Sequence, residues 1–273
     1  MFRAIARFTF VLAIVLPLGA AAPLAQAQRT LPDDAWCQEA LRNNDDDDRE
    51  RVCEVREFTL PRGSVAAETS NGSVRVTGED RGDILVRALV MAHARSEERA
   101  REVLKAVTIS TSGEIQADGP RRSGDRTGWW VSFRIQAPKS TDVRLRSSNG
   151  SLSVTDVKGA MRLRTSNGSI RLMDVGGDVE ADTSNGSVNA TVSGSSWDGA
   201  GLNVTTSNGS VRLTLPDGYN ARLVAGTSNG SINVDFPVTV RGRIGRDIDT
   251  NLGSGGPALR LRTSNGSVRI QRR

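Results

Sequence analysis

The residues best placed to do chemistry are two acidic side chains and two arginines at matching positions of a repeat. Glu180 and Asp182 lie in one copy of that repeat. Arg162 and Arg164 hold the equivalent positions in the preceding copy, so stacking would bring the four side chains together. Polysaccharide-active enzymes use clustered carboxylates. The same residues also fit a cross-strand charge ladder, whose exposed pairs contribute less than about 1 kcal/mol each. The charge ladder is the simpler interpretation, and a glycan-active lyase or hydrolase is the alternative.

Other catalytic and metal-binding patterns are missing from the sequence. His93 is the only histidine, and no Gly-x-Ser-x-Gly turn surrounds a serine. There is no phosphate-binding loop and no dinucleotide-binding glycine motif. The acidic run at 43–48 lacks the glycine that a calcium loop requires at its sixth position, where Asp48 stands instead. We therefore expect no catalytic residue, no cofactor and no metal site.

The first 27 residues have the pattern of a secretory signal. A basic start precedes the apolar run 8–22, and the small-x-small sequence 25–27 follows it. A retained membrane anchor is the alternative, although the run is short for a span. In an oxidising compartment Cys37 and Cys53, the two cysteines of the chain, would pair and stabilise the N-terminal segment by about 3 kcal/mol. We therefore expect an exported protein, either periplasmic or at the cell surface.

The charge pattern argues against a nucleic-acid partner. The formal net charge is +5, and opposite charges are interleaved along the chain rather than gathered in a basic stripe. Nearly all the basic residues are arginines. This composition predicts a solvated polar surface.

The elements that would position these residues come from a repeat. Ser-Asn-Gly-Ser occurs seven times, with spacings of 78, 18, 18, 23, 21 and 36 residues. The base period is 18, so we interpret the spacing of 36 as two periods that contain a degenerate copy of the motif at 245–249. A second degenerate copy lies at 110–115. The asparagines of the motif are Asn71, Asn149, Asn167, Asn185, Asn208, Asn229 and Asn265.

Between the motifs, apolar and polar residues alternate with a period of two, which is typical of strands with one buried face. Asn-Gly turns suit a hairpin meander. A β-solenoid explains more, because the whole Thr-Ser-Asn-Gly-Ser unit repeats and extra residues fall between the copies. In a solenoid the asparagines would form a hydrogen-bonded ladder, the threonines would point inward, and the glycines would accept positive φ.

The sequence predicts an all-β fold: a single-stranded β-helix or β-solenoid with coils of about 18 residues, one short flanking helix and a disulfide-closed N-terminal cap. The signal would span 1–27, the cap 28–60 and the solenoid 61–273. Ser96 would cap the helix at 96–106. Trp129 and Trp130 would lie on opposite faces of one strand.

The chain resembles the bacterial putative-adhesin family, a domain of unknown function with a β-helix shape. The resemblance rests on residues 53–57, the repeated motif, the helix at 96–106, the Trp129-Trp130 strand, and residues 196–199 and 235–238. It implies export and a β-helix. It supplies no catalytic residues.

These observations favour a non-catalytic envelope scaffold or adhesin-like binding protein. Its partner would be an anionic envelope polymer or another envelope protein. Self-association through the C-terminal coil is a further hypothesis, because the chain stops soon after Ile270 and would leave a strand edge unpaired. The candidate binding surface comprises Arg144, Arg146, Arg162, Arg164, Arg260, Arg262 and Trp197. For Trp197, a lid over the side of the solenoid is the simpler interpretation.

Overall fold

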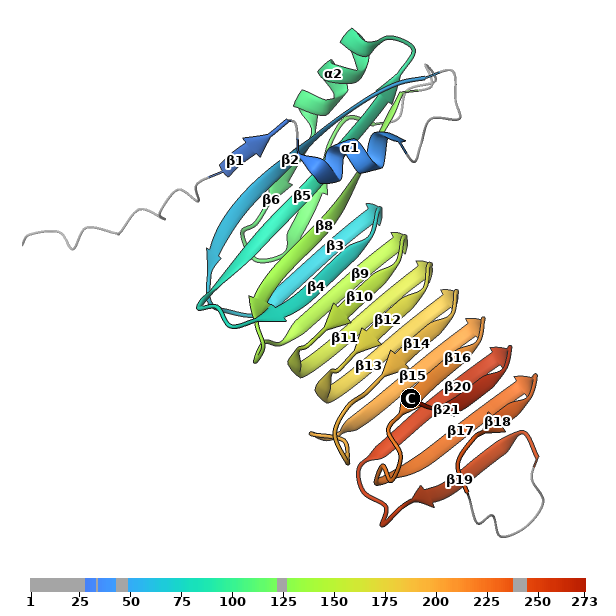
Figure 1. Cartoon of the computed structure of the whole chain (residues 1–273). Coiled ribbons are helices and arrows are strands. Elements are labelled where there is room, and N and C mark those ends of the chain that lie inside the picture. Colours follow the sequence, from blue (N-terminus) through green and yellow to red (C-terminus); the bar gives the residue numbers. More distant parts are fainter. Residues whose placement is uncertain (1–27, 33, 43–48, 122–126, 238–244) are drawn as a thin grey trace, which may run out of the picture.

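The computed structural model describes residues 28–32, 34–42, 49–121, 127–237 and 245–273. Within these residues the chain is mainly β-strand, with two short helices, and the strands form an eleven-stranded and a ten-stranded sheet (Figure 1). The all-β expectation is confirmed. The predicted signal segment and the acidic run at 43–48 lie outside the described residues.

Most of the chain forms a stack of coils, each with one strand in each sheet (Figure 1). Neighbouring coils pair in parallel, whereas a meander would pair consecutive strands antiparallel. In the ten-stranded sheet the coil strands, in spatial order, are β3 (Val65–Asn71), β9 (Val143–Asn149), β11 (Lys158–Asn167), β13 (Gly176–Asn185), β15 (Gly201–Asn208), β20 (Ala258–Asn265) and β17 (Ala221–Asn229). Their partners in the eleven-stranded sheet are β4 (Val74–Glu79), β10 (Leu152–Thr155), β12 (Ile170–Met173), β14 (Val188–Thr191), β16 (Val211–Leu215), β21 (Val268–Arg272) and β18 (Ile232–Val234).

The core between the two sheets is built from small aliphatic side chains in register. Leu163 lies beside Leu145 in one neighbouring coil and Ala181 in the other, and all three are buried. Because side chains alternate along a strand, the intervening residues point to solvent. The 18-residue period therefore places like residues over like and fixes two outer faces.

The order of the coils in space differs from their order in the sequence. β20 lies between β15 and β17, and β21 lies between β16 and β18. Figure 1 shows this C-terminal coil, in red, inside the stack. It has neighbours on both sides, so our premise that the C-terminal coil leaves a free edge for self-association is wrong.

The prediction of a degenerate copy of the motif at 245–249 is also wrong. Its residues enter β19 (Asp247–Leu252), which pairs antiparallel with β17 at the end of the ten-stranded sheet. The spacing of 36 residues therefore does not contain two successive coils. It contains β19, at the end of the sheet, and then β20, which lies between β15 and β17.

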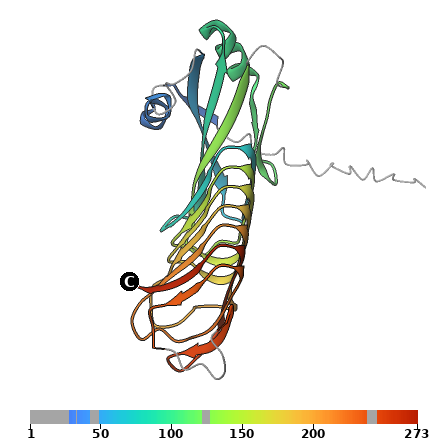
Figure 2. The same cartoon turned by 90° about the vertical axis from the view of Figure 1, so that its right-hand side faces the viewer.

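At the other end of the stack, long antiparallel strands extend the eleven-stranded sheet (Figure 2). We call this part the head: β1 (Gln28–Leu31), β2 (Glu50–Pro61), β5 (Asp83–Ala94), β8 (Gly128–Pro138), α1 (Ala35–Arg42) and α2 (Glu97–Ala106). β2 lies between β1 and β5, so much of the predicted cap is an internal strand. The prediction of a second degenerate copy at 110–115 is wrong as well. These residues join β6 (Thr108–Ser110) to β7 (Ile115–Asp118) in an antiparallel hairpin.

The two helices cover opposite faces of β5. Ala88, Val90 and Ala92 face the main core with the apolar side of α2, while Leu89 and Met91 pack in a second cluster with α1. The predicted start of α2 is correct, because the Ser96 hydroxyl accepts a hydrogen bond from the backbone N–H of Arg99 at 3.3 Å. The expectation of a single helix is wrong, because α1 is present as well. α1 is only eight residues long and lies in a segment without a repeat, so no sequence pattern indicated it.

Two contacts that occur only once secure the head. The predicted disulfide is confirmed: Cys37 of α1 and Cys53 of β2 are bonded, with their Cα atoms 5.8 Å apart. Buried Arg56 donates hydrogen bonds to the carbonyls of Leu104 and Val107 at the C-terminal end of α2. A cation there complements the negative end of the helix dipole, so Arg56 ties α2 to β2.

Candidate binding surface

The Asn-Gly corners form a continuous row along the stack. Six of the seven asparagine side-chain amides donate to the side-chain oxygen of an asparagine in the adjacent coil, at 2.9–3.1 Å, and Asn71 at the head end of the row accepts. These amide groups are exposed but are engaged with one another, as in stacked asparagine ladders. The motif is therefore an architectural element. The spatial order of the row is Asn71, Asn149, Asn167, Asn185, Asn208, Asn265 and Asn229.

The residues around each asparagine lock the coils at close range. The buried Thr183 hydroxyl donates to the Gly168 carbonyl of the neighbouring coil at 2.8 Å, and Thr165 donates to Gly150 at 2.9 Å. A Cβ on Gly168 would lie 2.1 Å from the Gly150 carbonyl oxygen. Glycine is therefore required mainly by this close approach. The predicted positive φ occurs at Gly72, Gly209 and Gly266, with values of 141°, 156° and 154°.

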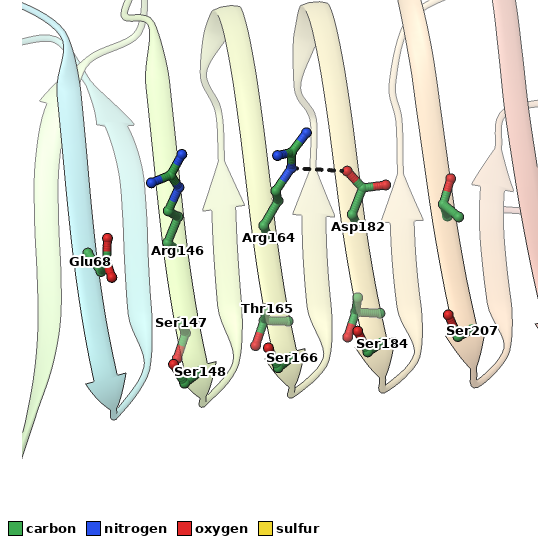
Figure 3. Close-up of a pocket in the computed structure, with 12 residues that line it drawn as sticks. Glu68, Arg146, Ser147, Ser148, Arg164, Thr165, Ser166, Asp182, Ser184 and Ser207 are labelled. Carbon is green, nitrogen blue, oxygen red and sulfur yellow. Dashed lines mark ion pairs between the residues drawn. The ribbon is translucent and has the colours of Figure 1, made fainter.

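The outer face of the ten-stranded sheet carries two in-register charged rows. The first row contains Arg144, Arg162, Glu180 and Arg260. The second row contains Glu68, Arg146, Arg164, Asp182 and Arg262. Figure 3 shows part of the second row above a row of serines, along a shallow hollow of about 490 Å³. The structure thus places all six predicted surface arginines on one face.

Opposite charges neutralise the middle of this face. The Arg162 guanidinium contacts Asp178 and Glu180, each at 2.9 Å, and Arg164 lies 3.5 Å from Asp182. The hydrogen bond to Asp178 is the main cause that raises the pKa of Arg162 above its usual value. The predicted charge ladder is therefore present, and both carboxylates considered for catalysis are engaged in it.

Towards the ends of this face, arginines stand without such partners. Within the described part of the chain, Arg144, Arg146, Arg260 and Arg262 make no ion pair. All four are exposed. They are the residues of this face that remain able to bind an anionic group.

Trp197 is not part of the candidate binding surface, which corrects that prediction, and it forms instead the lid over the side of the stack that was its simpler interpretation. Its side chain is buried in the main core, and its indole N–H donates to the Gly177 carbonyl at 2.9 Å. The insertion that carries Trp197 folds over the side of the stack, so the ring closes the core. Trp129 and Trp130 lie on opposite faces of β8, as predicted, and both rings are half-buried.

The model of the Toastrack DUF4097 family matches residues 49–271. The chain belongs to this family. The resemblance inferred from the sequence is thereby confirmed. No curated protein matches the Toastrack chain significantly.

Several solved structures resemble this Toastrack chain over most of their length. A "putative cell adhesion protein" from Clostridium sporogenes is 11% identical, with a TM-score of 0.47, and the match covers 82% of this chain and 100% of that one. A "putative adhesin" from Bacteroides fragilis is 8% identical, with a TM-score of 0.30 and coverage of 82% and 97%. A "putative lipid binding protein" from Parabacteroides distasonis is 9% identical, with a TM-score of 0.31 and coverage of 80% and 96%.

Other predicted features of the Toastrack chain lie in the head or outside the described residues. His93 hydrogen-bonds Arg49 at 3.1 Å and packs beside Trp130. In the described ranges, no three His, Cys, Asp or Glu side chains gather as a metal site would require. None of the described helices is long and apolar enough to cross a membrane.

Sequence reasoning missed the outer face of the eleven-stranded sheet. Arg75, Arg171, Arg212 and Arg269 occupy one row there, and all four are exposed. The signal was available, because each of them is the fourth residue after a motif asparagine. It was overlooked because other coils carry Ser153 or Asn189 at that position.

Proposed function

We propose that this chain is an exported, non-catalytic scaffold of the cell envelope, which binds an anionic polymer or another envelope protein through its polar sheet faces. The observation that carries this proposal is that consecutive coils present charged or polar side chains in register on their outer faces, at a fixed strand spacing of about 4.8 Å. A repeated row of polar groups suits an extended partner, since many weak contacts add up when they form on one rigid surface.

Two features support export. The segment 1–27 has the composition of a secretory signal. The Cys37–Cys53 disulfide suits an oxidising compartment. Sequencing the N-terminus of the protein recovered from cell fractions tests this part, and export predicts a mature chain that begins near Gln28. An intact N-terminus in the cytosolic fraction would contradict it.

Capture of partners from native envelopes tests the binding function. The mature chain, immobilised at physiological salt, should retain a polymer or protein that a charge-reversed form loses. Suitable reversals are Arg144→Glu and Arg146→Glu, because these arginines make no ion pair within the described residues. Arg162→Glu is less suitable, because it would set three carboxylates side by side. Equal capture by the reversed form and by the wild-type chain would contradict binding through this face.

A glycan-active enzyme is the second candidate. The observation that favours it is the hollow of about 270 Å³ lined by Arg162, Arg164 and Glu180, with Asp182 beside it. Incubation with uronic-acid polymers tests it, since turnover that disappears in Glu180→Gln or Asp182→Asn would establish this activity. The ion pairs of both carboxylates favour the scaffold, because an engaged carboxylate must first leave its partner to act as a base.

A further inference from the structure

The outer face of the eleven-stranded sheet carries a row of arginines that the two charged rows do not include. We call it the arginine row: Arg75, Ser153, Arg171, Asn189, Arg212 and Arg269. Each residue lies directly beside the next in register, so the row crosses the coil strands from β4 to β21. Adjacent strands lie about 4.8 Å apart, which places Arg171 and Arg212 about 10 Å apart and Arg212 next to Arg269.

No carboxylate neutralises this row within the described ranges. None of its four guanidiniums takes part in an ion pair there, whereas Arg162 and Arg164 on the opposite face are both paired. Acidic partners stand beyond the head end of the row, where Arg134 lies 4.0 Å from Glu39 and Arg87 contacts Asp34 and Glu57. The row is therefore an uncompensated positive strip on a folded, rigid sheet.

The head closes one end of this strip. Arg134 continues the row beside Arg75, and its guanidinium lies 4.0 Å from the centre of the Trp36 ring on α1. Burial is the main cause that lowers the pKa of Arg134, and the positive charge of Arg75 adds to it. α1 thus covers the row at Arg134 and leaves it open from Arg75 onwards.

Serines flank the arginines on one side, and threonines flank part of the row on the other. Because side chains alternate, the residues two positions before and after each row member point to the same face. The preceding position is serine in every coil, and the following position is threonine except at Met173, after Arg171, and Gln271, after Arg269. Arg212 and Arg269 border a hollow of about 350 Å³ together with Ser187, Ser210 and Ser267. The face therefore offers alternating guanidinium and hydroxyl groups.

We propose that this face binds a linear anionic polysaccharide, which lies across the coil strands along the arginine row. Guanidinium groups pair with carboxylates through two parallel hydrogen bonds. The hydroxyl rows would hydrogen-bond the sugar hydroxyls, and the fixed strand spacing suits a polymer with a regular charge repeat. Single-stranded nucleic acid fits less well, because it binds through stacking aromatic side chains, and the arginine row contains none.

A matched pair of double variants tests the site. Arg171→Ser with Arg212→Asn removes two charges from the arginine row, using residues that other coils already carry in that row, Ser153 and Asn189. Arg62→Ser with Arg95→Ser is the matched control, because it removes two exposed arginines that lie outside the arginine row and outside both charged rows, between β2 and β3 and directly after β5. Both doubles should keep the wild-type melting temperature, because every substituted side chain is exposed.

The measurement is the affinity of the mature chain for polygalacturonate at 0.15 M salt, with dextran and single-stranded DNA as comparison ligands. The arginine-row double should weaken polygalacturonate binding on the order of ten-fold or more, and the control double less than about two-fold. Dextran should not bind, and DNA should bind more weakly than polygalacturonate.

The inference rests on the proposed binding function, but the two can fail separately. Equal weakening by both doubles, or tighter binding of DNA, would overturn the polysaccharide site. The scaffold proposal would survive if envelope capture still depended on Arg144 and Arg146. Absence of any captured envelope component, together with no polygalacturonate binding, would overturn both.

Discussion

The stack and the head of this molecule are held together in different ways. In the stack, each coil repeats the same contacts: an asparagine rung, a threonine–glycine hydrogen bond and an in-register aliphatic pair. In the head, each important contact occurs once, as with the Cys37–Cys53 disulfide and Arg56 beneath α2. Repeated contacts distribute stability among neighbours, as in other repeat proteins, whereas single contacts concentrate it. The effects of substitutions on stability should therefore differ between the two regions, both in magnitude and in how many neighbouring elements are affected.

The largest effect should come from filling the space at a stacked glycine. Gly168→Ala would place a methyl group 2.1 Å from a backbone carbonyl oxygen, which can move only if two coils separate. We expect the free energy of unfolding in urea to fall by about 3 kcal/mol. Gly82→Ala, before β5, is the control, because a Cβ there meets nothing within 4 Å. Its stability should be unchanged or higher by about 0.4–1 kcal/mol. Equal values for the two variants would refute the close-approach requirement.

Loss of the disulfide should destabilise the head alone. Cys37 and Cys53 are 16 residues apart, and a loop of that size corresponds to about 3 kcal/mol. In the variant with both cysteines changed to serine, hydrogen exchange should accelerate in β1, α1 and β2, with little change in β11 to β14. If protection of the coils fell equally, the head and the stack would be one cooperative unit.

A single buried hydroxyl should have an intermediate effect. Thr183→Val keeps the shape of the side chain but removes the donor to the Gly168 carbonyl, so stability should fall by about 1–2 kcal/mol. Thr205→Val makes the same change on the exposed face of the adjacent β15 and should change stability by less than about 0.5 kcal/mol. Thermal unfolding of the two variants gives the comparison. A larger fall in melting temperature for Thr205→Val than for Thr183→Val would contradict the role of the buried hydroxyl.

The smallest effect should come from the charge ladder. Arg164 is 63% exposed and lies 3.5 Å from Asp182, so solvent screens the pair. Arg164→Gln should change the free energy of unfolding by less than about 0.5 kcal/mol, and this difference should shrink further in 0.5 M salt. A larger loss that persists at high salt would show that the ladder contributes to stability like a buried contact.

The repeat made much of the stack predictable. A period of 18 residues with alternating side chains specifies which residues face inward, and the recurring Thr-Ser-Asn-Gly-Ser unit specifies what must stack on what. The positions of Asn167 and Asn185, and the pairing of Arg164 with Asp182, followed from this. The sequence could not show which coil lies next to which in space, because all copies of the motif are interchangeable as neighbours.

The rest of the molecule depended on contacts that no local pattern encodes. Nothing in the sequence around Arg56 reveals that its side chain reaches the end of a helix about 50 residues later. The flanking Ser, Asp and Gly left Trp197 open to two interpretations, an exposed binding residue or a lid, and only the fold shows that its ring lies in the core. The arginine row was hidden by the coils that replace arginine with serine or asparagine.

The place of the C-terminal coil has a consequence for the order in which the molecule can assemble. Residues 221–234 leave the growing chain before residues 258–272, yet the later segment occupies the slot between them and β15 and β16. The stack therefore cannot be completed in the order of synthesis. The end coil, formed by β17 and β18, must either remain unpaired with the stack until β20 and β21 emerge, or first pair with β15 and β16 and then be displaced by them. The last segment to emerge thus acts as a keystone, whose insertion joins the end coil to the rest of the stack.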